Sequence, residues 1–290
     1  MTTACSAVSS QPTATEFVMS DADFDRIASI MYRETGIRLE ESKRSLVYAR
    51  LTKRLRKYGL RAFSEYCDLI DSGNAEQERI GLISALTTHV TRFYREPHHF
   101  EFMKQQALPP LIGAARAGKP VRMWSAGCSS GEEPYTMALT LLAAEPRANE
   151  LDIRILATDI DPITLDVGKA GRYHRNQIST VAPALRDQYF HDVGQDILEA
   201  DQRLKSLITF RTLNLNQERE WPFRGGFDIV FCRNVVIYFE ADIQARFWHR
   251  LAPKIREGGW LFLGHSERLS ECADAYYEGV DVTTYRRVAG

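Results

Sequence analysis

The chain has 290 residues, of which 44% are hydrophobic and 26% charged, and its formal net charge is −1 at pH 7. These values exclude a disordered or low-complexity chain and a global field that would attract nucleic acid or an acidic membrane. No apolar run approaches the ~18 residues of a membrane-spanning helix, and no export signal precedes the first predicted helix. The five cysteines are widely spaced, without a Cys-x-x-Cys pair. We therefore expect a cytoplasmic protein with reduced thiols, no metal site and no direct membrane insertion.

The N-terminal part of the chain is predicted to be helical. Residues 1–15 are rich in Ser, Thr and Ala and lack periodicity, so we expect a frayed tail. Residues 16–88 carry apolar side chains at helical spacing, with helix stops at Gly36, Gly59 and Gly73. Because no strand pattern interrupts them, these residues predict an all-helical N-terminal domain.

From residue 89 to residue 290, strands are predicted to alternate with helices. The expected strands are 121–126, 153–158, 227–232 and 260–263, and the expected helices are 96–117, 133–144, 162–169 and 242–256. This alternation predicts an α/β domain with a mostly parallel sheet that helices cover on both faces. Residues 173–210 are too long for an ordinary loop and predict a small inserted subdomain. Residues 276–288 are typical of a closing antiparallel hairpin.

A glycine-containing turn, Ser125–Glu133, follows the first predicted strand and opens the next helix. In an open α/β sheet this strand end is the usual ligand crevice, and glycine lets a ligand approach the backbone. The turn matches neither a P-loop nor the G-x-G-x-x-G fingerprint. Glu132 and Glu133 stand where a phosphate would bind, and they would repel it. The turn therefore favours a cationic ligand, although a tight turn with capping carboxylates would show the same pattern.

Asp159 closes the second predicted strand of the sheet. An acidic residue at this position commonly accepts hydrogen bonds from ribose hydroxyls. Combined with a turn that does not suit phosphate, it favours S-adenosylmethionine over NAD. Asn234 and Tyr238 follow the strand 227–232 at the same expected sheet edge, where they could contact a ligand. Packing in the core is the alternative for the tyrosine.

Residues 127–131 also satisfy G-x-S-x-G, the nucleophile elbow of α/β-hydrolases. Ser129, then Asp228 or Asp242, then His265 would follow in the chain order of that class. However, no His-Gly-Gly oxyanion motif precedes the turn, and the elbow would follow the first strand rather than a middle one. A serine hydrolase is therefore the weaker alternative.

Positive charge is concentrated in a helix predicted over about residues 41–58. Between Ser42 and Ser64 the chain has eight basic residues and no acidic one. At 100° per residue, six of them share one face: Lys43, Arg50, Lys53, Arg54, Lys57 and Arg61. One sign of charge without partners four residues away weakens a helix, so a binding role is favoured over a solvated face. Nucleic acid and an acidic helical bundle are both candidate partners.

Five motifs follow one another along the chain: Thr-Thr-x-x-Thr-x-Phe-Tyr-Arg-Glu, Ser-Ser-Gly-Glu-Glu-Pro-Tyr, Ala-Thr-Asp-Ile-Asp, Phe-Cys-Arg-Asn-Val-x-Ile-Tyr-Phe and Gly-His-Ser-Glu. This ordered set resembles the CheR family, chemoreceptor glutamate O-methyltransferases that use S-adenosylmethionine. The resemblance extends over about residues 17–288. It implies a Rossmann-like methyltransferase sheet over 89–290, with a small β-subdomain inserted at 173–210, preceded by the all-helical domain over 16–88.

The resemblance also implies a role for individual residues. The expected cofactor site is formed by His89, Thr91, Arg95, Glu133, Asp159, Asn214, Leu215, Arg233 and Asn234. Arg95 would also position the reacting groups and Tyr238 would lie beside the transferred methyl, so these two are the expected catalytic residues. Family members often carry asparagine at the position of His89. Glu133 is preferred over Glu132 on register alone.

The resemblance selects a partner for the basic face. It implies the cytoplasmic helical bundle of a chemoreceptor, whose glutamates would be methylated while S-adenosylhomocysteine is released, and it implies no nucleic acid. In some members the β-subdomain grips a C-terminal receptor pentapeptide through a glycine-rich loop. Residues 191–206 hold only Gly194, so we expect recognition of the receptor body instead of the tether. A catalytically idle adaptor with the same basic face is the alternative.

Overall fold

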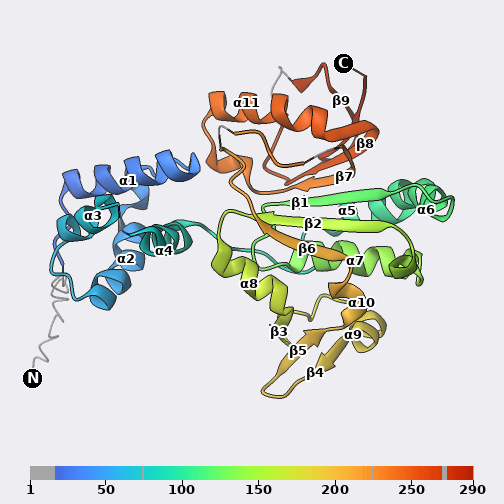
Figure 1. Cartoon of the computed structure of the whole chain (residues 1–290), viewed down its shortest axis with the longest axis horizontal. Coiled ribbons are helices and arrows are strands. Elements are labelled where there is room, and N and C mark those ends of the chain that lie inside the picture. The colour runs from blue at the N-terminus through green and yellow to red at the C-terminus, as the bar shows by residue number, and fades with distance from the viewer. Residues whose placement is uncertain (1–16, 74, 218, 224, 270–272, 290) are drawn as a thin grey trace, which may run out of the picture.

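The computed structural model describes residues 17–73, 75–217, 219–223, 225–269 and 273–289. The expected tail over 1–15 lies outside these residues. A group of helices from the N-terminal part lies beside a larger α/β part (Figure 1). Across the described ranges, no helix combines the length and the apolar character that crossing a membrane requires.

The N-terminal part is helical, as predicted. Its elements are α1 (Asp21–Thr35), a 3₁₀ turn (Glu41–Lys43), α2 (Arg44–Tyr58), α3 (Phe63–Asp71) and α4 (Glu76–Leu86). Ser20 and Asp23 form a reciprocal capping box that starts α1. Gly36 and Gly59, both in the left-handed conformation, end α1 and α2. The helices bury one shared apolar cluster that includes Met31.

A mostly parallel sheet forms the centre of the α/β part. In the described part of the chain its strands lie in the order β6-β2-β1-β7-β8-β10-β9. The bounds are β1 (Val121–Ala126), β2 (Ile153–Asp159), β6 (Ile208–Thr212), β7 (Phe227–Cys232), β8 (Ile255–Leu263), β9 (Tyr277–Asp281) and β10 (Thr284–Arg287). The pairs from β6 to β8 are parallel, whereas β10 is antiparallel to both β8 and β9. The chain builds outward from β1 to β6 and then returns to β7, so a crevice is expected beside the carboxyl ends of β1 and β7.

Helices cover both faces of this sheet. The elements are α5 (Pro97–Phe102), a π turn (Met103–Ala107), α6 (Leu108–Arg116), α7 (Glu132–Ala144), α8 (Pro162–Ala170) and α11 (Ala241–Leu251). Met123 belongs to the cluster that includes α6 and α7 residues, and its neighbour Trp124 belongs to the cluster that includes α11 residues. Alternate residues of β1 therefore face opposite layers, and this confirms the predicted α/β class.

The helix predicted over 242–256 is too long. In the structure α11 ends at Leu251, a 3₁₀ turn (Ala252–Lys254) follows, and Ile255 begins β8. The reason is Pro253, which has no backbone N–H and cannot continue a helix. Ile255, which lies inside the helix predicted over 242–256, instead pairs with Phe227 of β7.

A second, small sheet lies at the lower end of the molecule in Figure 1. It contains β3 (Arg172–His174), β5 (Ile197–Ala200) and β4 (Phe190–Asp192), all antiparallel, next to α9 (Pro183–Tyr189) and α10 (Gln202–Lys205). The insertion expected over 173–210 ends earlier than its predicted limit, because Ile208–Thr212 is β6 of the main sheet.

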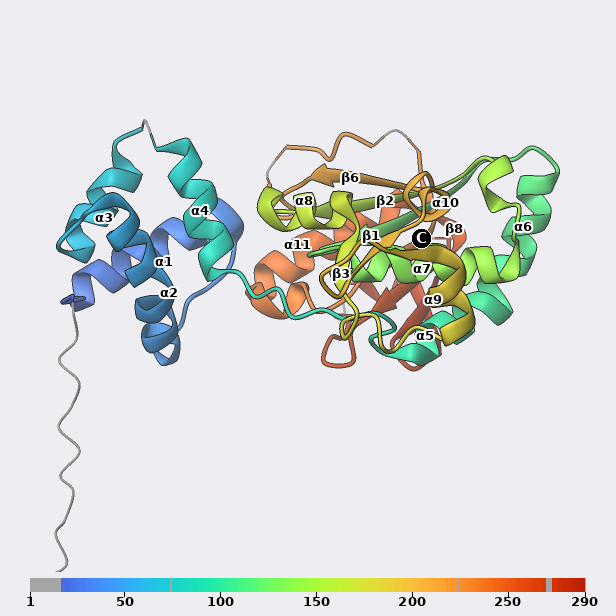
Figure 2. The same ribbon diagram turned by 90° about the horizontal axis from the view of Figure 1, so that it is seen from below.

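The helical part meets the α/β part at the carboxyl ends of the central strands (Figure 2). The carboxylate of Glu240 accepts hydrogen bonds from the Tyr32 hydroxyl at 3.1 Å and from Arg38 Nη1 at 2.9 Å. The side-chain amide of Asn214 donates to the carbonyl oxygen of Glu34 at 2.7 Å. These contacts bring the end of α1 over the edge of the sheet where a ligand crevice is expected.

Candidate active site

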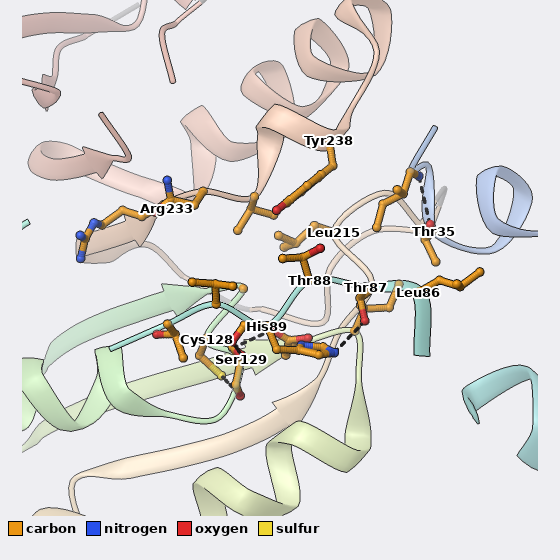
Figure 3. Close-up of a pocket in the computed structure, with 18 of the residues that line it drawn as sticks. Thr35, Leu86, Thr87, Thr88, His89, Cys128, Ser129, Leu215, Arg233 and Tyr238 are labelled. Carbon is orange, nitrogen blue, oxygen red and sulfur yellow. Dashed lines mark hydrogen bonds between the residues drawn. The ribbon is translucent and has the colours of Figure 1, made fainter. Parts of the chain in front are cut away.

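A cavity of about 460 Å³ opens between the helical part and the carboxyl ends of β1, β2 and β7 (Figure 3). This is a usual size for a small-molecule site. The structure brings together there every residue expected to bind the cofactor or to act in catalysis. The lining includes His89, Thr91, Arg95, Glu133, Asp159, Asn214, Leu215, Arg233, Asn234 and Tyr238.

The turn after β1 needs glycine at two positions. Gly127 and Gly131 have φ angles of 82° and 97°, which disfavour other residues. A Cβ atom on Gly127 would lie 2.3 Å from a methyl carbon of Val235, and one on Gly131 would lie 3.0 Å from the Cα of Gly168. The backbone can therefore come close both to the cavity and to its neighbours only because these side chains are absent.

Asp159 connects the end of β2 to that turn. One carboxylate oxygen accepts the backbone N–H of Ser129 at 2.7 Å, and the other accepts that of Asp161 at 3.0 Å. Asp159 is 9% exposed, and burial raises its pKa although both backbone hydrogen bonds oppose the shift. Each oxygen keeps a further lone pair, so the carboxylate can accept hydroxyl groups of a ligand.

The two glutamates at the start of α7 have different surroundings. Glu133 lines the cavity, where it accepts a hydrogen bond from Ser125 Oγ at 2.6 Å and faces Arg233 Nη1 at 3.2 Å. Glu132 accepts a hydrogen bond from Ser130 Oγ at 2.7 Å and is not part of the lining. Burial raises the pKa of both carboxyls, and for Glu133 the charge of Arg233 opposes that shift. The geometry therefore favours Glu133 as the carboxylate available to a ligand.

Arg233 is the buried cation of the site, with its side chain 2% exposed. Its guanidinium lies 3.2 Å from both Glu133 and Glu96 and donates to the carbonyl oxygen of Arg95. Burial alone would raise the pKa of Glu96, but Arg233 and hydrogen bonds from His265 outweigh burial and hold that pKa below its usual value. In Figure 3 the Arg233 guanidinium points away from Tyr238. Arg233 thus links Glu96, Glu133 and the backbone of Arg95 in the buried part of the site.

His89 and Arg95 come from the segment that joins the two parts. His89 Nε2 lies 2.8 Å from Thr87 Oγ1 and 3.2 Å from the buried Asp161 carboxylate. Burial lowers the pKa of His89, but Asp161 outweighs burial, so the net direction is upward. Arg95 Nη1 donates to the carbonyl oxygen of Val90 at 2.7 Å, and the guanidinium has further donors for a ligand.

The side chain of Asn214 is held by the protein. Its amide nitrogen donates to Glu34, as above, and its oxygen accepts the backbone N–H of Asn216 at 2.9 Å. Beside it, Leu215 is buried in the lining. Any adenine contact from Asn214 would therefore use its backbone or the one remaining N–H and lone pair.

The six basic residues expected on one helix face divide into two groups, and two of them lie outside α2: Lys43 is in the preceding 3₁₀ turn, and Arg61 follows Gly59, which ends the helix. The Arg54 guanidinium pairs with the buried carboxylate of Glu78 on α4, and Arg50 Nη1 donates to the carbonyl oxygens of Ala85 and Thr87 at 3.1 and 2.8 Å. Arg54 has no acidic partner four residues away, as the sequence indicates, but it is paired in the fold because Glu78 reaches it from another helix. Lys43, Lys53, Lys57 and Arg61 are exposed, and Lys43 and Arg50 also line the cavity.

No hydrolase triad forms among the residues proposed for it. Asp228 is the second residue of β7, at the opposite edge of the sheet, where it binds Arg256 and accepts the backbone N–H of Arg122. Asp242 pairs with the nearby Arg246. His265 binds Glu96 at 3.1 Å, and Ser129 Oγ donates to the carbonyl oxygen of His89 at 3.5 Å. The hydrolase hypothesis is therefore wrong.

Cys128 in the same turn is a buried free thiol, as are Cys67 and Cys232 among the described residues. Burial raises the pKa of Cys128 well above its ordinary value. The thiol is therefore protonated near neutral pH and is a poor nucleophile.

Several residues of the site were not singled out from the sequence. Glu96, which pairs with Arg233, stands inside the first of the five motifs, so its position was a signal even though no role was assigned to it. Thr35, Arg38 and Leu46 of the helical part also line the cavity. No local pattern marks them, because their place depends on how the two parts pack.

Comparison with known proteins agrees with this geometry. Residues 22–87 match the model of the CheR methyltransferase all-alpha domain, and residues 89–285 match that of the CheR methyltransferase SAM binding domain. A probable chemotaxis protein methyltransferase of Rhizobium etli is 47% identical over 260 residues, which cover 89% of this chain and 96% of the relative. The chemotaxis protein methyltransferase of Escherichia coli K12 is 36% identical over 258 residues, covering 87% and 86%. The chain therefore belongs to the CheR family of methyltransferases.

Proposed function

We propose that this chain transfers the methyl group of S-adenosylmethionine to glutamate side chains on the cytoplasmic helices of a chemoreceptor. The products are glutamate methyl esters and S-adenosylhomocysteine. The observation that carries the proposal is the cavity at the carboxyl ends of β1, β2 and β7, where Asp159 and Glu133 present two carboxylates and the turn offers no phosphate site. We propose that residues 16–88 form the helical domain and that residues 89–290 form the methyltransferase domain.

The residues of the cavity fit a sulfonium nucleoside. Asp159 has lone pairs for the two ribose hydroxyls, and Glu133 can accept the ammonium of the methionine end. Leu215 offers an apolar surface suited to the adenine ring, and the backbone of Asn214 can hydrogen-bond to its edge. His89, Thr91, Arg233 and Asn234 complete the wall. When bound, the cofactor supplies an electrophilic methyl group on a positively charged sulfur.

The chemistry needs no general base. A glutamate side chain has a pKa of ~4.3 and is already ionised at pH 7, so its oxygen forms the new bond as the carbon–sulfur bond breaks and sulfur keeps the electron pair. The task of the protein is alignment, which can contribute ~7–11 kcal/mol. Arg95 holds the acceptor carboxylate or the cofactor, and Tyr238 lines the place of transfer. In Figure 3 the Tyr238 hydroxyl points into the cavity.

Replacing Arg95 with alanine is expected to lower methyl transfer by about 100-fold or more, since misplacing the reacting groups has this effect. The fold should survive, because within the described part of the chain the Arg95 side chain donates one hydrogen bond, to the carbonyl oxygen of Val90. Transfer of labelled methyl to a receptor cytoplasmic fragment, with release of the label in base, measures ester formation. The matched control is Arg154→Ala, which removes an exposed arginine that also binds backbone carbonyls, outside the cavity. Turnover of Arg95→Ala within twofold of wild type would contradict the assignment.

The exposed part of the basic face is the proposed receptor-docking surface. It comprises Lys43, Lys53, Lys57 and Arg61, whereas Arg50 and Arg54 contribute charge while they also hold α4 in place. This surface would dock on the acidic helical bundle of the receptor. We propose no pentapeptide tether, because the stretch 191–206 has only one glycine.

A Lys53→Glu/Lys57→Glu variant is expected to lower kcat/KM for the receptor about tenfold at low salt, with the difference shrinking at high salt as charges are screened. Affinity for S-adenosylhomocysteine should not change, since neither lysine lines the cavity. The control is Lys104→Glu/Lys119→Glu, two exposed lysines on the α/β part. If receptor methylation by wild type is flat between low and high salt, this surface is not the docking face.

A further inference from the structure

Glu267 belongs to the last of the five motifs, Gly264–Glu267, to which the proposed chemistry gives no task. It follows β8 and is 2% exposed. It does not line the cavity, but it lies against the loop after β7, which carries Arg233, Asn234 and Tyr238. A buried carboxylate at this place needs partners.

Those partners are four backbone N–H groups. One carboxylate oxygen accepts from Asn234 and Gly264, both at 2.7 Å, and the other accepts from Val235 at 2.8 Å and Val236 at 2.9 Å. Three of the donors are consecutive residues, an arrangement typical of an anion-binding backbone nest. Here the anion is a side chain of the same protein, and its acceptor sites are fully used.

The loop that Glu267 holds has an unusual shape. Asn234 has a φ angle of 59°, in the left-handed region that non-glycine residues seldom adopt. A Cβ atom on Gly264 would lie 2.6 Å from the side-chain nitrogen of Asn234, so the two loops can approach this closely only with glycine at that position. The 3₁₀ turn that follows, Val236–Tyr238, brings Tyr238 to the cavity.

We infer that Glu267 is a positioning residue whose carboxylate fixes the Arg233–Tyr238 loop in the conformation that forms one wall of the cofactor cavity. The inference rests on the proposed function only in that this wall serves S-adenosylmethionine. The negative charge is essential, because all four partners are donors. A glutamine at this position would turn an NH₂ group toward some of them.

The test compares wild type with Glu267→Gln and Glu267→Asp. Amide hydrogen exchange reports the loop itself, calorimetry with S-adenosylhomocysteine reports the cavity, and methyl transfer separates kcat from the receptor KM. Glu267→Gln should accelerate exchange at Asn234, Val235 and Val236 about 100-fold and weaken binding at least about tenfold. It should lower kcat while changing the receptor KM less than about twofold. Glu267→Asp, which keeps the charge, should recover part of each effect.

The matched control is Glu145→Gln. Glu145 is also a buried carboxylate that accepts a backbone N–H, from Arg147 at 3.1 Å, and it also pairs with Arg116. It lies at the end of α7, outside the cavity lining. This variant should lower stability without changing exchange at residues 234–236 or ligand affinity.

Wild-type exchange at residues 234–236 in Glu267→Gln, with unchanged ligand affinity, would overturn the inference. If Glu267→Gln does not fold, the same two measurements are made on Glu267→Asp. Wild-type exchange at residues 234–236 together with wild-type ligand affinity in that variant would also overturn the inference. If wild type itself binds no S-adenosylhomocysteine, the proposed function fails. The exchange rates still decide whether Glu267 fixes the loop.

Discussion

Replacing Asp159 with alanine is expected to weaken S-adenosylhomocysteine binding by at least about 100-fold and to abolish methyl transfer at ordinary cofactor concentrations. Hydrogen bonds to a charged group contribute about 1.5–3 kcal/mol each, and Asp159 is proposed to accept two from the ribose. The same carboxylate holds the backbone of Ser129 and Asp161. Its loss therefore removes a ligand contact and loosens the turn that shapes the cavity.

Calorimetric titration of S-adenosylhomocysteine into both proteins measures this effect. The matched control is Asp228→Ala, because Asp228 is also a buried strand-end carboxylate that accepts a backbone N–H. It lies outside the cavity lining, at the opposite edge of the sheet. The control should lose stability and retain affinity, provided that the titration is run well below its unfolding temperature. If Asp159→Ala binds as tightly as wild type, Asp159 does not anchor the ribose.

Replacing Arg233 with methionine is expected to lower the free energy of unfolding by about 3–5 kcal/mol at pH 7, the usual effect of removing one partner from a buried ion pair. The carboxylates of Glu96 and Glu133 would remain in a buried site without their cation. For a chain of this size each kcal/mol shifts the unfolding temperature by roughly 2–4 °C, so the unfolding temperature should fall by roughly 6–20 °C. Differential scanning calorimetry measures the shift.

The stability that Arg233→Met loses should become smaller as the pH falls. Without Arg233, burial raises the folded-state pKa of Glu96 and Glu133 above their unfolded values. A carboxyl with a raised pKa destabilises the fold at pH values above its unfolded pKa, and the penalty disappears when both states are protonated. The difference in the free energy of unfolding between wild type and Arg233→Met should therefore decrease as the pH falls toward about 4.

Two controls separate this effect from a general loss of charge. Arg122→Met breaks an exposed ion pair with Asp152, which should be worth no more than about 1 kcal/mol. The double variant Arg233→Met/Glu96→Gln removes one of the stranded charges and should recover part of the stability. An unfolding temperature of Arg233→Met within 2 °C of wild type, taken as roughly the size of a 1 kcal/mol effect, would mean that Arg233 does not stabilise the buried part of the site.

The two middle strands β1 and β7 could be predicted closely from the sequence, whereas the start of β6 was expected inside the insertion and the start of β8 inside a helix. The limits expected for β1 and β7 coincide with those in the structure. Strands in the middle of a parallel sheet are buried on both faces and so appear as short continuous apolar runs. The glycines of the turn and the acid at the end of β2 are also local signals, because each follows directly from where a strand ends.

What could not be predicted depends on contacts between distant segments. Thr35, Arg38 and Leu46 line the cavity because the helical part lies over the carboxyl ends of the strands. The pairing of Arg54 with Glu78 joins two helices, so a search along α2 alone could not find it. Likewise, G-x-S-x-G is satisfied in sequence at 127–131, but the positions of Asp228 and His265 show that spacing along the chain does not bring a triad together.

The central claim is that the cavity at the carboxyl ends of β1 and β2 binds the nucleoside cofactor with its ribose on Asp159. A crystal structure of the chain with S-adenosylhomocysteine tests it most directly. The account predicts the ribose hydroxyls within hydrogen-bonding distance of the Asp159 carboxylate and the amino end of the ligand beside Glu133. Clear density for the ligand at another place, with the cavity filled by water alone, would contradict it.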